Sequence, residues 1–261
     1  MNIIVCVKQV SDPEAPVSTF KLNPEAKRQI PAQGVPPVLN PFDENALEAA
    51  LRIKDSHEAK ISVVSMGQTL AKAVVRKSLA AGADELFLLE DALFDTFDSY
   101  ITAYVLSVAI KKIGNYDLIL TGRVANDTTA GQVGLGIAEI LGIPSITLAR
   151  KVDAVDSKLR VERVVSDGIE VIETSTPALV TVSSELGDLR SVPVRELMAA
   201  LKKPLTTWKA QDLAIDSSLL ERTTIRKMFT PVKEGKCEII GGEESEAGVN
   251  LALRLRDAKI I

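Results

Sequence analysis

One loop of the chain combines residue types that bind anions. Residues 121–136, TGRVANDTTAGQVGLG, follow an apolar run at 116–120 and precede another at 137–141. Glycine lets a backbone approach a bound group closely, and the guanidinium of Arg123 can form paired hydrogen bonds to a phosphate. Backbone N–H groups at a helix start also favour an anion. Two explanations stay open: a nucleotide phosphate held by this loop, or a capped strand-to-helix turn without a ligand.

Other residues of this loop would share in binding. We expect the helix to start near Thr129, so that the hydroxyls of Thr128 and Thr129 and the N–H groups from Ala130 onward serve the anion. Asp127 suits an anion site poorly, and we expect it to cap the helix or to accept hydrogen bonds from ribose hydroxyls. The candidates are Gly122, Arg123, Val124, Ala125, Asp127, Thr128, Thr129, Ala130, Gly131, Gln132, Val133 and Gly134.

The composition argues against several other kinds of site. The 261 residues are 46 % apolar and 25 % charged, which suits one large globular domain or two smaller ones. A net charge of −4 does not favour nucleic acid, and no apolar run reaches the roughly 18 residues of a membrane span. One histidine, His57, and two cysteines, Cys6 and Cys237, give no metal-binding spacing. We find no motif of a serine nucleophile, so we predict no catalytic residue. The first residues lack the features of an export signal, so we expect a cytoplasmic protein.

The elements that position the loop alternate between strand and helix. We predict strands at 3–10, 61–67, 85–89, 116–120 and 177–182, and helices at 40–54, 70–81, 99–112 and from about 130. Asn40 as N-cap, Pro41 at the first helical position and Asp43 in the first turn mark the first helix start. This alternation predicts an α/β fold: a mostly parallel sheet with helices on both faces.

Ligands of such sheets bind at the carboxyl ends of the strands. The first strand ends near Cys6 and Lys8, and the second ends at Met66 and Gly67. We therefore expect these four residues at the same edge as the loop.

The last third of the chain changes character. Two alternating runs at 159–165 and 169–173 flank Asp167-Gly168 and predict a β-hairpin. A short helix is expected at 194–203. We expect an α/β domain at 1–203, and residues 204–261 to form an extended C-terminal arm. Apolar residues between Trp208 and Phe229 favour an arm that packs on a partner over a loosely structured tail.

Several segments together resemble one family. They are VCVKQV (5–10), NPFDENALEAALRIKD (40–55), VSMG (64–67), AAGADE (80–85), GRVANDTTAGQVG (122–134), the hairpin with the strand that follows it (161–182) and LRSVPVRELMAALKKP (189–204). Over nearly its whole length the chain resembles the beta subunit of electron transfer flavoprotein. It departs from that pattern at Ser166, where an acidic residue is usual.

The resemblance implies a Rossmann-like, adenine-nucleotide-binding domain and a partner. That partner is a larger alpha subunit with a redox-active FAD, around which the C-terminal arm wraps. The matching nucleotide positions are Cys6, Asn40, Pro41, Phe42, Asp43, Met66 and the loop from Gly122 to Gly134. The segment at 189–204 resembles the one that recognises dehydrogenases, and we expect Leu197 or Met198 to contact a flavin-dependent dehydrogenase.

The family implies two possible nucleotides. Ordinary members hold a structural AMP, whereas a bifurcating subset holds a second FAD that takes a hydride from NADH and divides the electrons between ferredoxin and the alpha flavin. Arg123 and Asp43 resemble that subset, although Val124, Thr128 and Thr129 depart from it. We expect FAD and bifurcation, with AMP as the alternative. A nucleotide-binding module of the universal-stress type, which would self-associate, is a further alternative.

Overall fold

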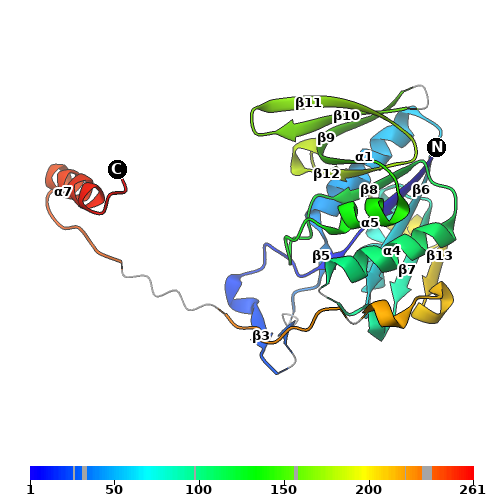
Figure 1. The fold of residues 1–261 in the computed structure, drawn as a ribbon, viewed down its shortest axis with the longest axis horizontal. Helices are drawn as coiled ribbons and strands as arrows, with labels where there is room; N and C mark the ends of the chain where they lie inside the picture. The colour runs from blue at the N-terminus through cyan, green and yellow to red at the C-terminus, as the bar shows by residue number, and fades with distance from the viewer. Residues whose placement is uncertain (26, 31–33, 97, 156–157, 221, 231–236) are drawn as a thin grey trace.

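The computed structural model describes all residues except 26, 31–33, 97, 156–157, 221 and 231–236. Its centre is a nine-stranded sheet with the order β11-β10-β9-β12-β8-β1-β6-β7-β13 (Figure 1). The six parallel strands from β12 to β13 are, in chain order, β1 (Asn2–Cys6), β6 (Lys60–Gly67), β7 (Glu85–Glu90), β8 (Leu118–Gly122), β12 (Ala178–Val182) and β13 (Leu205–Trp208).

Helices cover both faces of this sheet. The helices of the α/β body are α1 (Pro41–Ser56), α2 (Lys72–Val75), α3 (Lys77–Ala81), α4 (Ser99–Ile113), α5 (Val133–Leu141) and α6 (Val194–Ala200), and a further helix, α7 (Glu244–Asp257), follows near the C-terminus. Alternate residues of a strand point to opposite faces. Ile3 of β1 packs with buried residues of α1 and α3, whereas Ile4 packs with those of α4 and α5. The predicted fold class is therefore confirmed, since the two-sided burial explains the continuous apolar strands.

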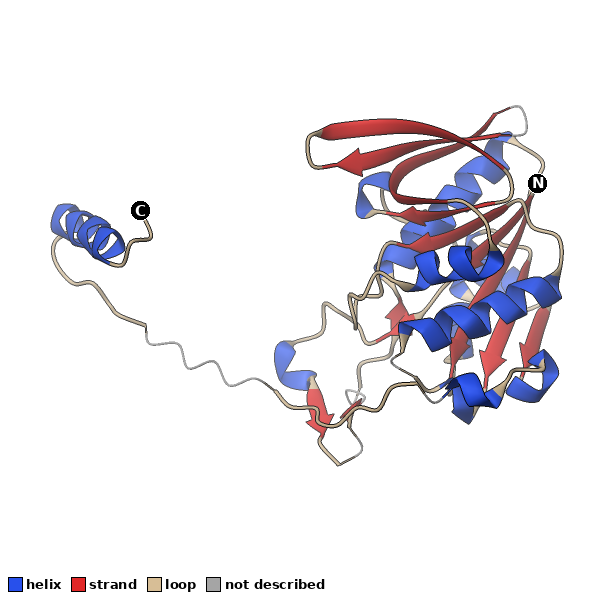
Figure 2. Cartoon of the chain, viewed as in Figure 1, coloured by secondary structure: helices blue, strands red, loops and turns tan. Residues whose placement is uncertain are grey.

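The hairpin extends this sheet in an antiparallel ribbon (Figure 2). It consists of β10 (Lys158–Val165) and β11 (Gly168–Ser175), and its turn residues are Ser166 and Asp167 instead of the expected Asp167-Gly168 pair. β9 (Ser145–Val155), which the sequence analysis missed, pairs in parallel with β12 at its start and antiparallel with β10 further on. The long strand β9 thereby joins the parallel part of the sheet to the antiparallel hairpin.

Some predicted boundaries were wrong. The strand expected at 3–10 ends at Cys6, and Gln9–Val10 (β2) instead pairs with Val38–Leu39 (β5) in a separate ribbon. The helix expected at 70–81 divides into α2 and α3 at Arg76, and the helix expected from about 130 begins at Val133. Hydrophobic periodicity does not report such breaks, because the apolar stripe continues across them.

Short elements complete the chain. They are β3 (Lys21–Asn23), β4 (Arg28–Ile30) and the 3₁₀ turns η1 (Val17–Thr19), η2 (Ala92–Phe94), η3 (Ser184–Leu186), η4 (Ala210–Leu213) and η5 (Ser217–Leu220). Among the described residues, no helix is both long and apolar enough to span a membrane.

The expected start of the arm at residue 204 lies directly before β13, a strand of the sheet. β13 pairs with β7, the Trp208 ring lies 4.9 Å from the Phe87 ring, and Leu213 is buried against the α4 side of the sheet. The first part of the expected arm therefore belongs to the α/β body. Further along, α7 lies apart from the sheet and its helices (Figure 1) and carries the exposed apolar residues Val249 and Leu251.

Candidate functional site

A cavity of about 300 Å³ lies at the carboxyl ends of β1, β6 and β8. This is the edge at which parallel sheets bind their ligands, and the volume is at the lower end of ligand pockets. Of the predicted residues, those that line it are Cys6, Lys8, Asp43, Met66, Gly67, Gly122, Arg123, Val124, Ala125, Asp127, Thr128, Ala130, Gly131, Gln132, Val133 and Gly134. Four predicted residues, Asn40, Pro41, Phe42 and Thr129, are not among the residues that line it.

The Asn40 side chain forms hydrogen bonds to the backbone of the 122–134 loop. Its side-chain Nδ2 donates to the Val124 carbonyl at 2.8 Å, and its Oδ1 accepts from the Asn126 N–H at 3.0 Å. Asn40 occupies the predicted N-cap position of α1, and its backbone carbonyl accepts from the Asp43 and Glu44 N–H groups, but its side chain forms no hydrogen bond that caps the helix. Asn40 thus fixes the loop that the sequence placed 84 residues away.

Asp43 ties two strand ends to the start of α1. One carboxylate oxygen accepts from the Lys8 N–H at 2.7 Å, and the other accepts from the Gly122 N–H at 3.0 Å. Burial raises the pKa of Asp43 to about 7, although both N–H groups act to lower it. The carboxyl group is therefore a structural junction at the cavity wall.

The raised pKa has a consequence for stability. Because the folded pKa of Asp43 lies above the unfolded value of 3.8, the folded chain binds more protons between the two values. The stability from this group is fully present below about pH 4, and it is lost as the pH rises through about 7.

Two glycines allow the loop to pack closely. A Cβ at Gly122 would lie 2.5 Å from Asp43 Oδ1, and a Cβ at Gly134 would lie 2.6 Å from Thr121 Oγ1. Between them Thr129 and Gly131 adopt left-handed conformations, with φ of 50° and 64°. The loop thus turns sharply before α5, and only glycine fits at its two ends.

The charged side chains of the loop differ from expectation in their partners. Asp127 forms an ion pair with Lys8, with Nζ and Oδ2 2.7 Å apart, instead of capping a helix. The Arg123 guanidinium lies 5.1 Å from the centre of the Phe42 ring and is exposed. Arg123 is therefore held beside the cavity by a cation–π contact, and its exposed guanidinium can donate to an anion.

The start of α5 lies later than predicted. Because α5 begins at Val133, Thr128 and Thr129 lie in the preceding turn, and the helix N–H donors begin at Val133. Within the described residues, no side chain caps this helix start. The dipole and N–H groups of α5 remain suited to an anion at the cavity.

Sequence reasoning missed one whole wall. Residues from the β6–α2 connection and from the segment between β7 and α4 also line the cavity. They include Thr69, Phe94 and Thr96, and Ser99 and Thr102 at the start of α4 line the cavity as well. Ligands of parallel sheets bind at the carboxyl ends of the strands, and this rule applies to β7 as well. The residues that follow β7 could therefore have been predicted from the sequence as part of the site. Thr121, with which the predicted phosphate-binding loop begins, lines the cavity as well, and its buried Oγ1 has no hydrogen-bond partner among the described residues.

The cavity shows binding chemistry more than catalytic chemistry. Burial, with a smaller contribution from Asp43, raises the pKa of the Cys6 thiol to about 12, so this sulfur stays protonated and is a poor nucleophile. No group of three or more potential metal ligands occurs among the described residues. Hydroxyl, amide and guanidinium donors beside apolar side chains such as Met66 and Leu106 suit a nucleotide.

The two predicted partner-binding residues lie outside this cavity. Leu197 and Met198 are on α6 and are 43 % and 62 % exposed. Val194 and Leu201 at the two ends of this helix are exposed as well. Together these four residues form an exposed apolar face.

Comparison with known proteins gives consistent matches. A family model described as the electron transfer flavoprotein domain matches residues 29–213. The chain is 41 % identical, over the whole of both chains, to an electron transfer flavoprotein subunit beta of Thermoanaerobacterium thermosaccharolyticum. It is 38 % identical, again over the whole of both, to the caffeyl-CoA reductase-Etf complex subunit CarD of Acetobacterium woodii. Protein FixA of Azorhizobium caulinodans is 33 % identical over 88 % of this chain and 85 % of its own.

Proposed function

This chain belongs to the electron transfer flavoprotein family as a beta subunit, and on that premise we propose that its cavity binds the phosphates of FAD. Membership implies an adenine nucleotide, FAD or AMP, and an alpha-subunit partner. Because the chain belongs to this family, the alternative of a nucleotide-binding module of the universal-stress type no longer applies.

The observation that carries the proposal is the fit of the loop to a phosphate. Gly122 and Gly134 let the loop pack closely against its neighbours, because a Cβ at either position would collide with protein atoms. The α5 start and Arg123 provide donors on the cavity side, and the buried Thr121 hydroxyl lies beside them without a partner in the described chain. These features bind and orient the nucleotide.

When bound, FAD would supply the acceptor for a hydride from NADH and the means to divide its electrons between ferredoxin and the alpha-subunit FAD. The residues of this chain hold the adenine and phosphate portions and exclude water from them. Phe94 is the only aromatic side chain among the described residues that line the cavity. A flavin ring would therefore need further contacts from the alpha subunit.

AMP is the second candidate. A cavity of about 300 Å³ with a single aromatic side chain suits a mononucleotide better than a whole dinucleotide. The two candidates differ in what the purified heterodimer releases on denaturation: two FAD per heterodimer, or one FAD and one AMP.

The test of the phosphate site is Arg123→Ala in the heterodimer. Loss of the guanidinium should cost about 1.5–3 kcal/mol, the scale of a hydrogen bond to a charged group, or roughly ten- to a hundredfold in nucleotide affinity. Arg150→Ala is the control, because Arg150 pairs with Glu162 on the β9–β10 ribbon outside the cavity. Wild-type affinity in Arg123→Ala would refute the assignment of this arginine.

We also propose that the exposed apolar face of α6 contacts a dehydrogenase. Leu197 and Met198 are at its centre. The relative CarD is named as a subunit of a caffeyl-CoA reductase complex, which supports a flavin-dependent enzyme of CoA esters as the class of partner. The exposed apolar residues of α7 support the proposal that the tail packs on the alpha subunit.

A further inference from the structure

We infer that Arg190 is a positioning residue, which locks the segment before α6 onto α1 and so holds the apolar face of α6 in its docking position. The inference rests on the proposed docking function of α6. Arg190 and its partners on α1 do not themselves belong to the exposed apolar face of α6.

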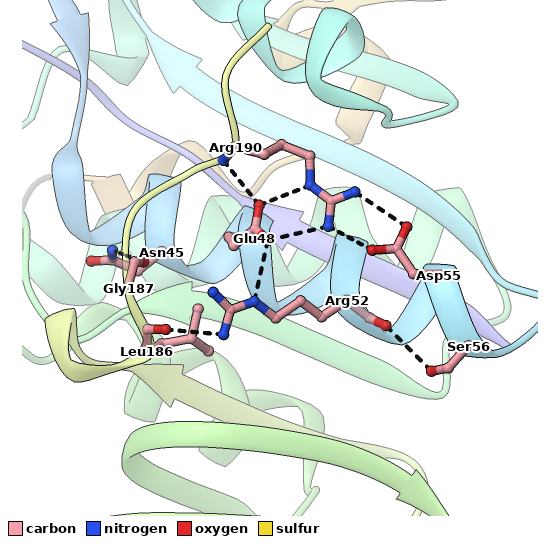
Figure 3. Close-up of polar contacts among 8 residues, drawn as sticks. All are labelled: Asn45, Glu48, Arg52, Asp55, Ser56, Leu186, Gly187 and Arg190. Carbon is pink, nitrogen blue, oxygen red and sulfur yellow. Dashed lines mark hydrogen bonds and ion pairs between the residues drawn. The ribbon is translucent and has the colours of Figure 1, made fainter.

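Helix α1 carries a polar stripe that faces this segment (Figure 3). The stripe consists of Asn45, Glu48, Arg52 and Asp55, whose spacing of three, four and three residues places them along one side of a helix. Asn45 Nδ2 donates to the Gly187 carbonyl at 2.7 Å, and Arg52 Nη1 donates to the Leu186 carbonyl at 3.0 Å. The stripe thus binds the chain from residue 186 onward.

Arg190 makes the most extensive contact with the stripe. Its Nε and Nη2 donate to the two carboxylate oxygens of Glu48 at 3.0 and 3.1 Å. Its Nη1 and Nη2 donate to the two oxygens of Asp55 at 3.2 and 2.7 Å. The Arg190 backbone N–H also donates to Glu48, at 3.1 Å. One planar guanidinium therefore bridges two carboxylates across two turns of α1, which a lysine ammonium cannot reproduce.

The charges make this contact specific. The Glu48 side chain is only 7 % exposed, so its carboxylate depends on Arg190 and Arg52 for compensation. Despite its burial, hydrogen bonds from Arg190 and Arg52 keep the pKa of Glu48 below its usual value. Removal of Arg190 would leave this carboxylate with Arg52 as its one remaining side-chain partner in the described chain. The ion pair between Arg190 and Glu48 thus anchors the segment before α6 to α1.

Polar contacts hold the other end of α6 as well. Lys203 Nζ donates to the carbonyls of Leu79 and Ala83 at 2.8 and 2.7 Å, and Arg76 Nη1 donates to the Ala200 carbonyl at 3.2 Å. Residues 187–193, in contrast, form no helix or strand. The entry to α6 is therefore held by side chains: Leu189 and Val192 pack against the core, and Arg190 makes most of the hydrogen bonds described for this segment.

Hydrogen exchange of the heterodimer tests the inference without a dehydrogenase. In Arg190→Lys, amides of residues 187–201 should exchange at least about tenfold faster than in the wild type, equivalent to about 1.4 kcal/mol of local opening. Arg195→Lys is the matched control, because Arg195 lies on α6 itself, is largely exposed and pairs with its neighbour Glu196. Unchanged exchange in Arg190→Lys would overturn the inference.

Steady-state kinetics with a flavin-dependent acyl-CoA dehydrogenase as the probe gives a second readout. Arg190→Lys and Glu48→Gln should each raise the KM for the dehydrogenase about tenfold, with kcat changed less than about twofold and nucleotide content unchanged. Both variants break the contact between Arg190 and Glu48, and each also weakens one further contact, of Arg190 with Asp55 or of Glu48 with Arg52. The double variant should therefore be less affected than the product of the two single effects. Effects that multiply would instead show that the two residues act independently, and would overturn the positioning of this segment by the Arg190–Glu48 contact.

The two proposals fail in different ways. If Leu197→Glu leaves the KM for the dehydrogenase unchanged, the proposal that α6 docks the dehydrogenase is wrong. The hydrogen-exchange measurement then still supports or overturns the positioning role of Arg190. If Leu197→Glu raises the KM but Arg190→Lys changes neither exchange nor KM, the docking face stands and the positioning role of Arg190 is wrong.

Discussion

Gly122→Ala tests the packing of the loop against the start of α1. An added Cβ would lie 2.5 Å from Asp43 Oδ1, 2.6 Å from the Phe42 carbonyl carbon and 2.8 Å from the Asp43 nitrogen. Two of these atoms belong to the backbone of a helix start, so the new methyl group can be accommodated only if a strand end or the helix moves. Movement would also stretch the hydrogen bond from the Gly122 N–H to Asp43.

The magnitude follows from these two effects. Overpacking costs about 1–3 kcal/mol, and a buried polar group that loses its partner costs about 1–3 kcal/mol more. The sum is roughly 2–6 kcal/mol. For a domain of this size each kcal/mol lowers the melting temperature by about 2–4 °C, so we expect a fall of at least about 4 °C, with loss of bound nucleotide.

Gly67→Ala is the matched control for this change. Gly67 also ends a parallel strand at the cavity, but a Cβ there would meet the Leu70 side chain at 3.1 Å, which can shift. Its effect should stay within about 1 kcal/mol of the wild type. Thermal unfolding of the purified heterodimers gives both values. Equal melting temperatures for the two variants would refute the close-packing explanation of Gly122.

Three other perturbations probe the buried carboxyl group, the exposed helix face and the tail. Asp43→Asn removes a titration, so the melting temperature of the wild type relative to this variant should fall as the pH rises from about 5 to 8; parallel curves would contradict the raised pKa of Asp43. Leu197→Glu and Met198→Glu should each slow electron transfer to a dehydrogenase while shifting the melting temperature by less than about 2 °C, because both side chains are exposed; a large loss of stability would mean that they pack in the core. Removal of residues 237–261 should leave the α/β body folded but abolish co-purification with the alpha subunit, and retained co-purification would exclude α7 as the main contact.

Local sequence patterns were sufficient for the class of fold and for part of the site. Apolar runs that alternate with helical periodicity predict a parallel sheet covered on both faces, because each pattern reports the burial of its own element. The same patterns placed the loop at 122–134 beside the strand ends at Cys6 and Gly67, since the carboxyl ends of parallel strands share one edge.

The pairing of side chains was decided by the tertiary structure alone. Lys8 bonds to Asp43 and Asp127, which are 35 and 119 residues away, and Arg190 reaches back 142 residues to Glu48. A sequence shows that these residues can donate or accept, but topology selects which donor meets which acceptor. For the same reason the edge strand β13 and the long strand β9 escaped prediction, because a strand is fixed by the neighbour with which it pairs as much as by its own residues.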